Sequence, residues 1–210
     1  MSLSRWGALF GVLTAVLLLA GVLISPDTPD GDADDQEWIN YVQDDESLLL
    51  IRAYLFVGAA VSLLAFYSFG VRPRLGEVEV TDRALAGLGA GAALLAGGSF
   101  IFAGLIGAAV GAAHIFSDIP VDPSIARLFD NLMYGGLVVA GALCLGVVMA
   151  VVAIQTQRRA AFPQWILWVS VLGILGMAAS LIFLPFVLAP IWLIAVSVAL
   201  FRAGTVPAVA

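Results

Sequence analysis

Long runs of apolar residues with few charges constrain the fold of this chain more than any motif does. The hydrocarbon core of a bilayer is about 30 Å thick, and a helix needs about 20 apolar residues to cross it. Of the 210 residues, 62% are hydrophobic and 11% are charged, whereas a soluble domain has about 25% charged residues. The sequence therefore predicts an all-α integral membrane protein and argues against a soluble enzyme.

We expect one transmembrane domain over residues 1–210, folded as a six-helix transmembrane bundle. The expected spans cover residues 6–24, 48–71, 84–116, 125–154, 165–184 and 186–201. The last two are separated only by LPFVLAP, whose prolines favour a tight hairpin; the alternative is one long bent helix. The third run would be about 50 Å long as a straight helix, so the third and fourth helices either tilt strongly or project outward as a hairpin, which we expect.

Arginine is the only basic residue type, and its distribution predicts the orientation. With the N-terminus inside, seven arginines lie in cytoplasmic segments and only Arg52 and Arg127 lie in outer ones. Cytoplasmic loops of membrane proteins carry such an excess of basic residues. We therefore expect a multi-pass protein of the cell (plasma) membrane, with both termini cytoplasmic and an acidic extracytoplasmic loop over residues 26–47.

The second half of this acidic loop predicts a short amphipathic helix. Asp34 can cap it, and Glu37 three residues later completes a variant of the capping box. Trp38, Tyr41 and Val42 then share one face. That face either docks a partner or packs on the membrane surface or the bundle, and we expect the latter.

Composition excludes several kinds of site. His114 is the single histidine and Cys144 the single cysteine, so one chain supplies neither two axial haem ligands nor the four ligands of a structural zinc site. We expect no cofactor, no metal and no catalytic residues. The net charge of −6 without a basic cluster argues against nucleic acid as a partner.

Ionisable and polar side chains near the membrane gather at the expected outer boundary: Arg52, Tyr54, His114, Asp118, Arg127, Asp130, Asn131 and Tyr134. Together they could form an outward-facing pocket for a small molecule, a lipid head group or a cation, or they could anchor helix ends in structural pairs. We expect Arg52 and Asp130 to pair and to fix the second span against the fourth, because each charge alone is costly in hydrocarbon. The alternative is that each extends separately to the head groups.

Glycines recur four residues apart in the third run, at Gly87 and Gly91 and again at Gly107 and Gly111. Small residues at this spacing let membrane helices approach closely. They could form a face for a second copy or another membrane protein, or pack within the chain, as we expect.

Four stretches carry a resemblance to a known group of proteins. They are the opening RWGALFGVLTAVLLLAGVLI, the acidic loop leading into WINYV, the RAYLF start of the second span and the closing LPFVLAPIWLIAVSVALFR. On these stretches the chain resembles uncharacterised actinobacterial multi-pass membrane proteins of unknown function. The resemblance implies six spans and assigns no catalytic residue. The Asp-rich, Lys-free loop would also suit a haloarchaeal protein.

Two functions remain open from the sequence. The first is a non-enzymatic accessory or scaffolding subunit that contacts a partner through its outer face or an apolar face of the bundle. The alternative is a small-molecule or lipid transporter or binding protein that uses the outward-facing polar cluster. An exposed apolar face favours the first, and a water-accessible cavity favours the second.

Overall fold

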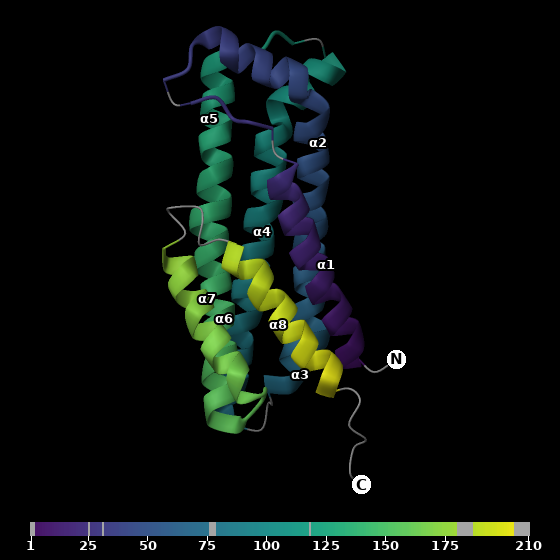
Figure 1. Ribbon diagram of the computed structural model, residues 1–210, viewed down its shortest axis with the longest axis vertical. Coiled ribbons are helices and arrows are strands. Elements are labelled where there is room, and N and C mark those ends of the chain that lie inside the picture. The colour runs from purple at the N-terminus through teal and green to yellow at the C-terminus, as the bar shows by residue number, and fades with distance from the viewer. Residues whose placement is uncertain are drawn as a thin grey trace.

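The computed structural model describes residues 3–24, 26–30, 32–75, 79–117, 119–179 and 187–203, and within them every regular element is helical. Figure 1 shows an elongated bundle. In chain order, the elements are α1 (Leu3–Leu23), α2 (Asp35–Ala65), the π-helical η1 (Phe66–Val71), α3 (Arg72–Leu75), α4 (Val80–Ser117), α5 (Pro123–Tyr134), the π-helical η2 (Gly135–Gly141), α6 (Ala142–Arg159), α7 (Gln164–Ala178) and α8 (Leu188–Ala203).

The two ends of the bundle differ in charge. We call one the acidic end; it holds the described residues of the segment 26–47 and the α4–α5 connection. The arginine-rich end holds α3, the end of α6, the start of α1 and the end of α8 (Figure 1). Arg72, Arg74, Arg158 and Arg159 belong to α3 and α6 at this second end. The segregation of charge expected from the sequence is therefore present in three dimensions.

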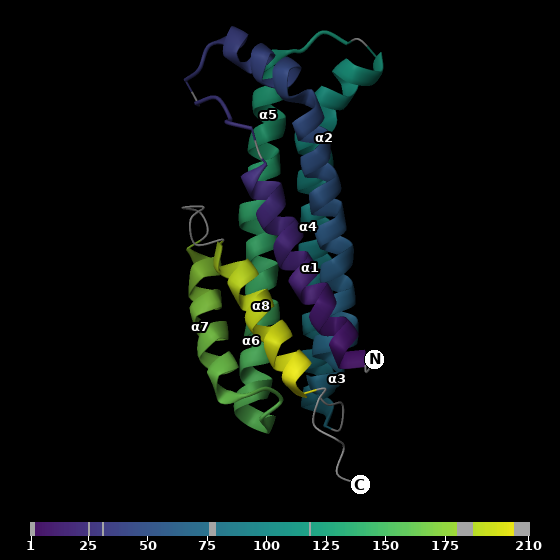
Figure 2. The ribbon, with the colours of Figure 1, turned by 45° about the vertical axis from the view of Figure 1, so that its right-hand side comes forward.

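Among the residues that the structure describes, four helices are long and apolar enough to cross a membrane: Leu3–Leu23, Asp35–Leu75, Val80–Ser117 and Pro123–Arg159. Helices α7 and α8 are also apolar, but they have 15 and 16 residues, or about 23 Å each at 1.5 Å per residue. Within the described residues the all-helical fold is confirmed and the four long apolar helices are compatible with a membrane bundle, whereas the count of six spans is not confirmed. α7 and α8 are two separate helices side by side (Figures 1 and 2), not one bent helix. The expected turn at Pro185 lies outside the described residues.

The longest helices extend well past the others at the acidic end. Helix α4 has 38 residues and would be about 57 Å long if straight, nearly twice the hydrocarbon thickness. Figures 1 and 2 show that α2, α4 and α5 continue beyond the last turn of α1 and beyond α7 and α8. The helices of the third and fourth expected spans therefore project beyond the rest of the bundle at this end.

Small residues bring the helices close together toward the arginine-rich end of the bundle. A Cβ on Gly7 of α1 would collide with the backbone of Gly70 in η1, so these helices touch along their backbones. Trp192 of α8 is fully buried, packs edge-on against Phe66 with 6.0 Å between ring centroids, and donates its indole N–H to Ser170 Oγ at 2.9 Å. These contacts hold α1, η1, α7 and α8 together.

The expected amphipathic helix forms, but it is the first part of α2 and not a separate element. Asp34 caps it as expected, accepting the Glu37 N–H at 2.9 Å. Figure 1 shows that these first turns lie across the acidic end before α2 turns along the bundle.

Trp38, Tyr41 and Val42 are buried in a second core with Leu49, Val121 and Ala126. Their shared face is therefore covered by the chain itself, and the idea that it docks a partner is wrong.

The two pairs of glycines have different surroundings. A Cβ on Gly107 would lie 2.7 Å from Met133 Sδ, and one on Gly111 would lie 3.4 Å from Leu49, so this pair packs within the chain as expected. Gly87 and Gly91 have no atom within 4 Å of the Cβ position. This second pair faces out of the bundle.

Candidate functional site

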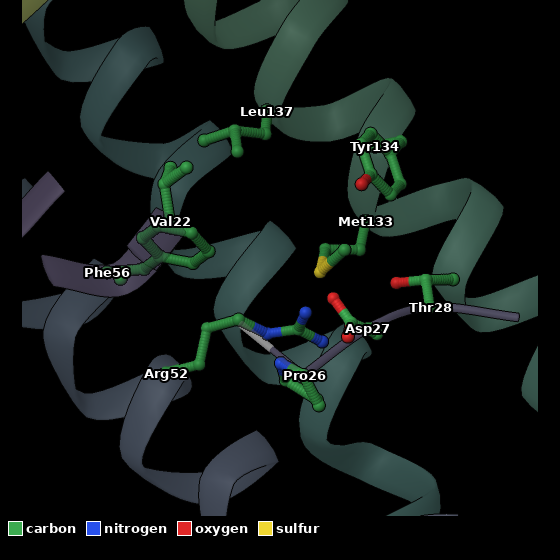
Figure 3. A pocket seen from close by; sticks show the side chains of 10 residues that line it. Val22, Pro26, Asp27, Thr28, Arg52, Phe56, Met133, Tyr134 and Leu137 are labelled. Atoms are coloured by element: carbon green, nitrogen blue, oxygen red, sulfur yellow. The ribbon is translucent and has the colours of Figure 1, made fainter. Parts of the chain in front are cut away.

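A cavity of about 300 Å³ opens at the acidic end, where α1 finishes beside α2 and α5. Its lining residues are Gly21, Val22, Pro26, Asp27, Thr28, Arg52, Phe56, Met133, Tyr134 and Leu137. Figure 3 shows that the Arg52 guanidinium extends toward Asp27, while Thr28 and Tyr134 lie on the other side of Met133 from Phe56. The cavity thus combines an apolar wall with a small number of polar groups, as ligand sites commonly do.

Arg52 is the central polar group of this cavity. It is only 2% exposed, although it lies in a helix that is apolar on either side of it. A Cβ on Gly107 would be 3.1 Å from Arg52 Nη2, so the guanidinium packs closely against α4 at this glycine. The sequence of α4 therefore makes room for a charge between helices.

Asp130 of α5 and Tyr41 of α2 lie close to Arg52. Both are more than nine-tenths buried, and the charges of Arg52 and Asp130 are near enough to act on one another and on the Tyr41 hydroxyl. Within the described residues, Asp130 Oδ1 and the Tyr41 hydroxyl have no hydrogen-bond partner. The structure thus places the two expected residues in one buried cluster, while a direct ion pair between them stays a prediction.

A second hollow, of about 430 Å³, adjoins the cavity and is strongly acidic. It is lined by Asp27, Thr28, Pro29, Asp30, Glu37, Asn40, Tyr41, Asp44 and Asp45. Asp27 and Thr28 belong to both hollows. The two hollows therefore lie next to each other along this segment.

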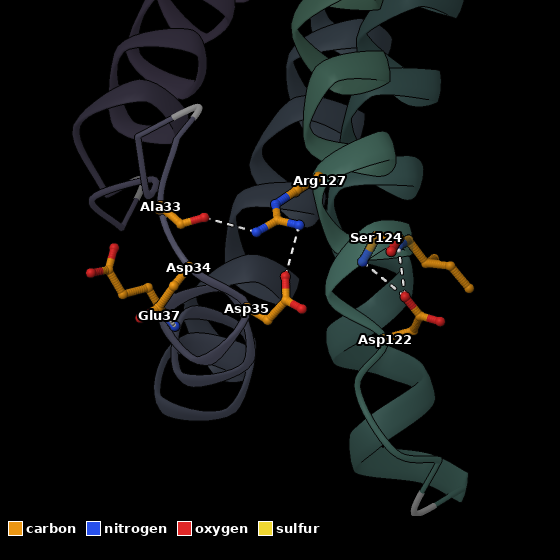
Figure 4. A network of polar contacts seen from close by, with 8 residues as sticks. Ala33, Asp34, Asp35, Glu37, Asp122, Ser124 and Arg127 are labelled. Atoms are coloured by element: carbon orange, nitrogen blue, oxygen red, sulfur yellow. Dashed lines mark hydrogen bonds and ion pairs between the residues drawn. The ribbon is translucent and has the colours of Figure 1, made fainter.

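Arg127 has a structural position outside the cavity. Its Nη2 donates to the Ala33 carbonyl at 2.8 Å, and its Nη1 lies 2.9 Å from Asp35 Oδ1 (Figure 4). The guanidinium also lies 5.9 Å from the Trp38 ring centroid, within the range of a cation–π contact. Arg127 thereby fastens α5 to the start of α2.

The remaining expected site residues are not brought into the cavity. Tyr54 is 78% exposed, and the exposed Asn131 donates to a backbone carbonyl of its own helix at 2.9 Å. His114 Nε2 lies 4.0 Å from Glu46 Oε2, and Asp118 lies outside the described residues. Of the eight residues, Arg52 and Tyr134 line the cavity, and Asp130 adjoins Arg52.

The arginine-rich end holds a polar network that the sequence did not suggest. Asp82 of α4 is fully buried; its Oδ1 accepts the Gln155 amide at 3.2 Å, and its Oδ2 lies 2.7 Å from Arg159 Nη2. Arg159 also pairs with Glu79 Oε1 at 2.6 Å. The contacts of Asp82 with Gln155 and Arg159 join the start of α4 to the end of α6.

Comparison with known proteins adds no assignment: no protein-family model, curated protein or solved structure matches the chain. Within the part of the chain that the structure describes, no group of three His, Cys, Asp or Glu residues could hold a metal ion. The residues that line the cavity include groups that can hold a ligand. A guanidinium can hold a carboxylate or phosphate through two parallel hydrogen bonds, and the apolar wall can hold a hydrocarbon group.

Proposed function

We propose that this is a membrane-embedded binding protein, or the binding unit of a transporter, whose cavity takes an amphiphilic molecule by its anionic end. The observation that carries the proposal is Arg52, buried at 2% exposure yet lining a cavity of about 300 Å³. A charge so placed is costly in a membrane and commonly marks a functional site. The volume is within the usual range of small-molecule sites.

The cavity is lined by both apolar and polar side chains. Val22, Phe56 and Leu137 offer apolar surface, while Arg52 and Tyr134 offer groups that bind an anion. The cavity lies at the last turn of α1, where one apolar helix ends. A molecule with its polar group at that depth would keep its hydrocarbon part beside the bundle, as a lipid of the outer leaflet does.

The proposed setting is the cell membrane, with the arginine-rich end in the cytoplasm, both termini inside and six crossings. It is supported by the gathering of arginines at one end of the bundle, as the positive-inside rule expects. Helices α7 and α8 would then cross with the help of residues beyond their described turns or a locally thinner bilayer.

The test compares two lipids with the same acyl chains: dioleoylphosphatidic acid and dioleoylglycerol, which lacks the phosphate. Lipid bound to the detergent-purified protein is counted by native mass spectrometry. We expect the protein to prefer the phosphate-bearing lipid, and Arg52→Gln to reduce its affinity about tenfold or more, because hydrogen bonds to charged groups contribute about 1.5–3 kcal/mol. Arg52→Lys should recover part of it.

The matched control is Arg83→Gln, which removes an exposed arginine at the opposite end. If Arg52→Gln does not fold, Val22→Trp, which fills the cavity and leaves Arg52 in place, should lower binding instead. Equal binding of both lipids, or equal loss in Arg52→Gln and Arg83→Gln, would contradict the proposal.

A second candidate is an accessory or scaffolding protein that associates through α4. The observation that favours it is the outward face at Gly87 and Gly91, where no atom lies within 4 Å of either Cβ position. Glycines four apart on an open face permit close approach of a second helix. Gly87→Leu should then abolish cross-linked dimers in membranes, and unchanged cross-linking would remove this candidate.

A further inference from the structure

The two hollows at the acidic end have opposite electrostatic character and share Asp27 and Thr28 as lining residues. The cavity presents Arg52, and the acidic hollow presents five carboxylates, from Asp27, Asp30, Glu37, Asp44 and Asp45. Asp27 borders both, and Figure 3 shows the Arg52 guanidinium extending toward it. An anion held by Arg52 would therefore lie near the Asp27 carboxylate.

The acidic hollow and the buried Arg52 cluster have one residue in common, Tyr41. Tyr41 lines the acidic hollow and is 7% exposed. Its hydroxyl is enclosed and lies near Thr28, Arg52 and Asp130. The acidic hollow is therefore adjacent to the Arg52 cluster as well as to the cavity.

On these grounds, and resting on the proposed function, we propose that the ligand is zwitterionic. Its phosphate or carboxylate would bind Arg52 in the cavity, and its ammonium group would bind Asp27 and the acidic hollow. Attached to a hydrocarbon chain, this is the chemistry of an aminophospholipid head group. A free zwitterion such as O-phosphoethanolamine shares the polar part but would leave the apolar wall of Val22, Phe56 and Leu137 uncovered.

The experiment compares dioleoylphosphatidylethanolamine with dioleoylphosphatidylglycerol, which share the phosphodiester and acyl chains but differ in the ammonium group. Each is added to the detergent-purified protein and counted by native mass spectrometry; O-phosphoethanolamine is a third arm. We expect the ethanolamine lipid to bind best and the free zwitterion to bind weakly.

Asp27→Asn should reduce the preference for the ethanolamine lipid by about fivefold, as expected for the loss of one partly exposed ion pair. Asp44→Asn should reduce it less. The matched control is Asp32→Asn, which removes the same charge from the same loop outside both hollows. All three substitutions lie in exposed residues, so folding is not at issue.

The outcomes separate the two proposals. If both phospholipids bind equally and Asp27→Asn behaves like Asp32→Asn, while Arg52→Gln still abolishes binding, the zwitterion is wrong and the anion site stands. If Arg52→Gln leaves the binding of both lipids unchanged, the anion site itself is wrong. If O-phosphoethanolamine binds as tightly as the lipid, the ligand is a soluble zwitterion and the lipid source is wrong.

Discussion

The buried cluster of Arg52 and Asp130 makes a quantitative prediction about the coupling of α2 to α5. Both side chains are more than nine-tenths buried, and their charges act on one another. Removing one member of a fully buried pair costs up to about 3–5 kcal/mol in soluble proteins. Measured couplings between polar groups on membrane helices are smaller, averaging about 0.6 and reaching about 1.7 kcal/mol.

Because Arg52 and Asp130 carry opposite charges and are almost fully buried, we expect their coupling free energy to lie near the upper end of the range for polar groups on membrane helices, at about 1.5 kcal/mol. Arg52→Ala and Asp130→Ala should each destabilise the protein, since each removes a charge that stabilises the other. The double variant should lose less stability than the sum of the two single losses, by that amount. The free energy of unfolding is measured by titrating sodium dodecyl sulfate into mixed micelles and following tryptophan fluorescence.

The control cycle combines Asp130→Ala with Arg83→Ala, because Arg83 lies at the other end of the bundle and should be independent of Asp130. Distant sites add within about 0.3–0.5 kcal/mol. If the Arg52–Asp130 cycle is additive to the same precision as the control, the two residues do not hold each other. Each would then extend separately toward water, and the cluster would have no role in fixing α2 against α5.

Two further predictions concern packing and orientation. Gly7→Ala should lower the free energy of unfolding by about 1–3 kcal/mol, because a Cβ there collides with the backbone of η1. The control Gly87→Ala, in open space, should change the free energy of unfolding by less than about 0.5 kcal/mol. Equal effects of the two substitutions would contradict the α1–η1 contact. In a Cys144→Ala background, Ser117→Cys should react with an impermeant maleimide from outside intact cells and Gln157→Cys should not, and labelling of Gln157→Cys from outside would reverse the proposed orientation.

Much of the fold follows from the sequence because apolar length is a strong constraint in a bilayer. The start of α2 was predictable in the same way, since Asp34 has both the right side chain and a glutamate three residues on. The continuation of this helix into the expected second span was also predictable, because no glycine or proline lies between Asp34 and Leu48. The expectation of a separate amphipathic helix was therefore wrong, because no helix-breaking residue divides it from the second span.

The candidate site was only partly predictable. Arg52 and Asp130 stood out because a charge beside an apolar run is conspicuous. Asp27 and Tyr41 were not assigned to the site, since nothing local shows that the loop after α1 folds back against α2. The Asp82–Arg159 network could have been found from topology, because the start of the third helix and the end of the fourth meet at one end of a hairpin.

The most direct test of the proposed lipid-binding cavity is to map the residues that a bound amphiphile contacts. Dioleoylphosphatidic acid that carries a diazirine near the top of one acyl chain is photolysed with the purified protein, and the adducts are mapped by mass spectrometry. The account predicts adducts on the cavity wall, at Val22, Met133 and Leu137, which disappear in Arg52→Gln. Adducts spread over outward-facing residues such as Leu95 and Leu172, and unchanged in Arg52→Gln, would show that the cavity does not bind the lipid.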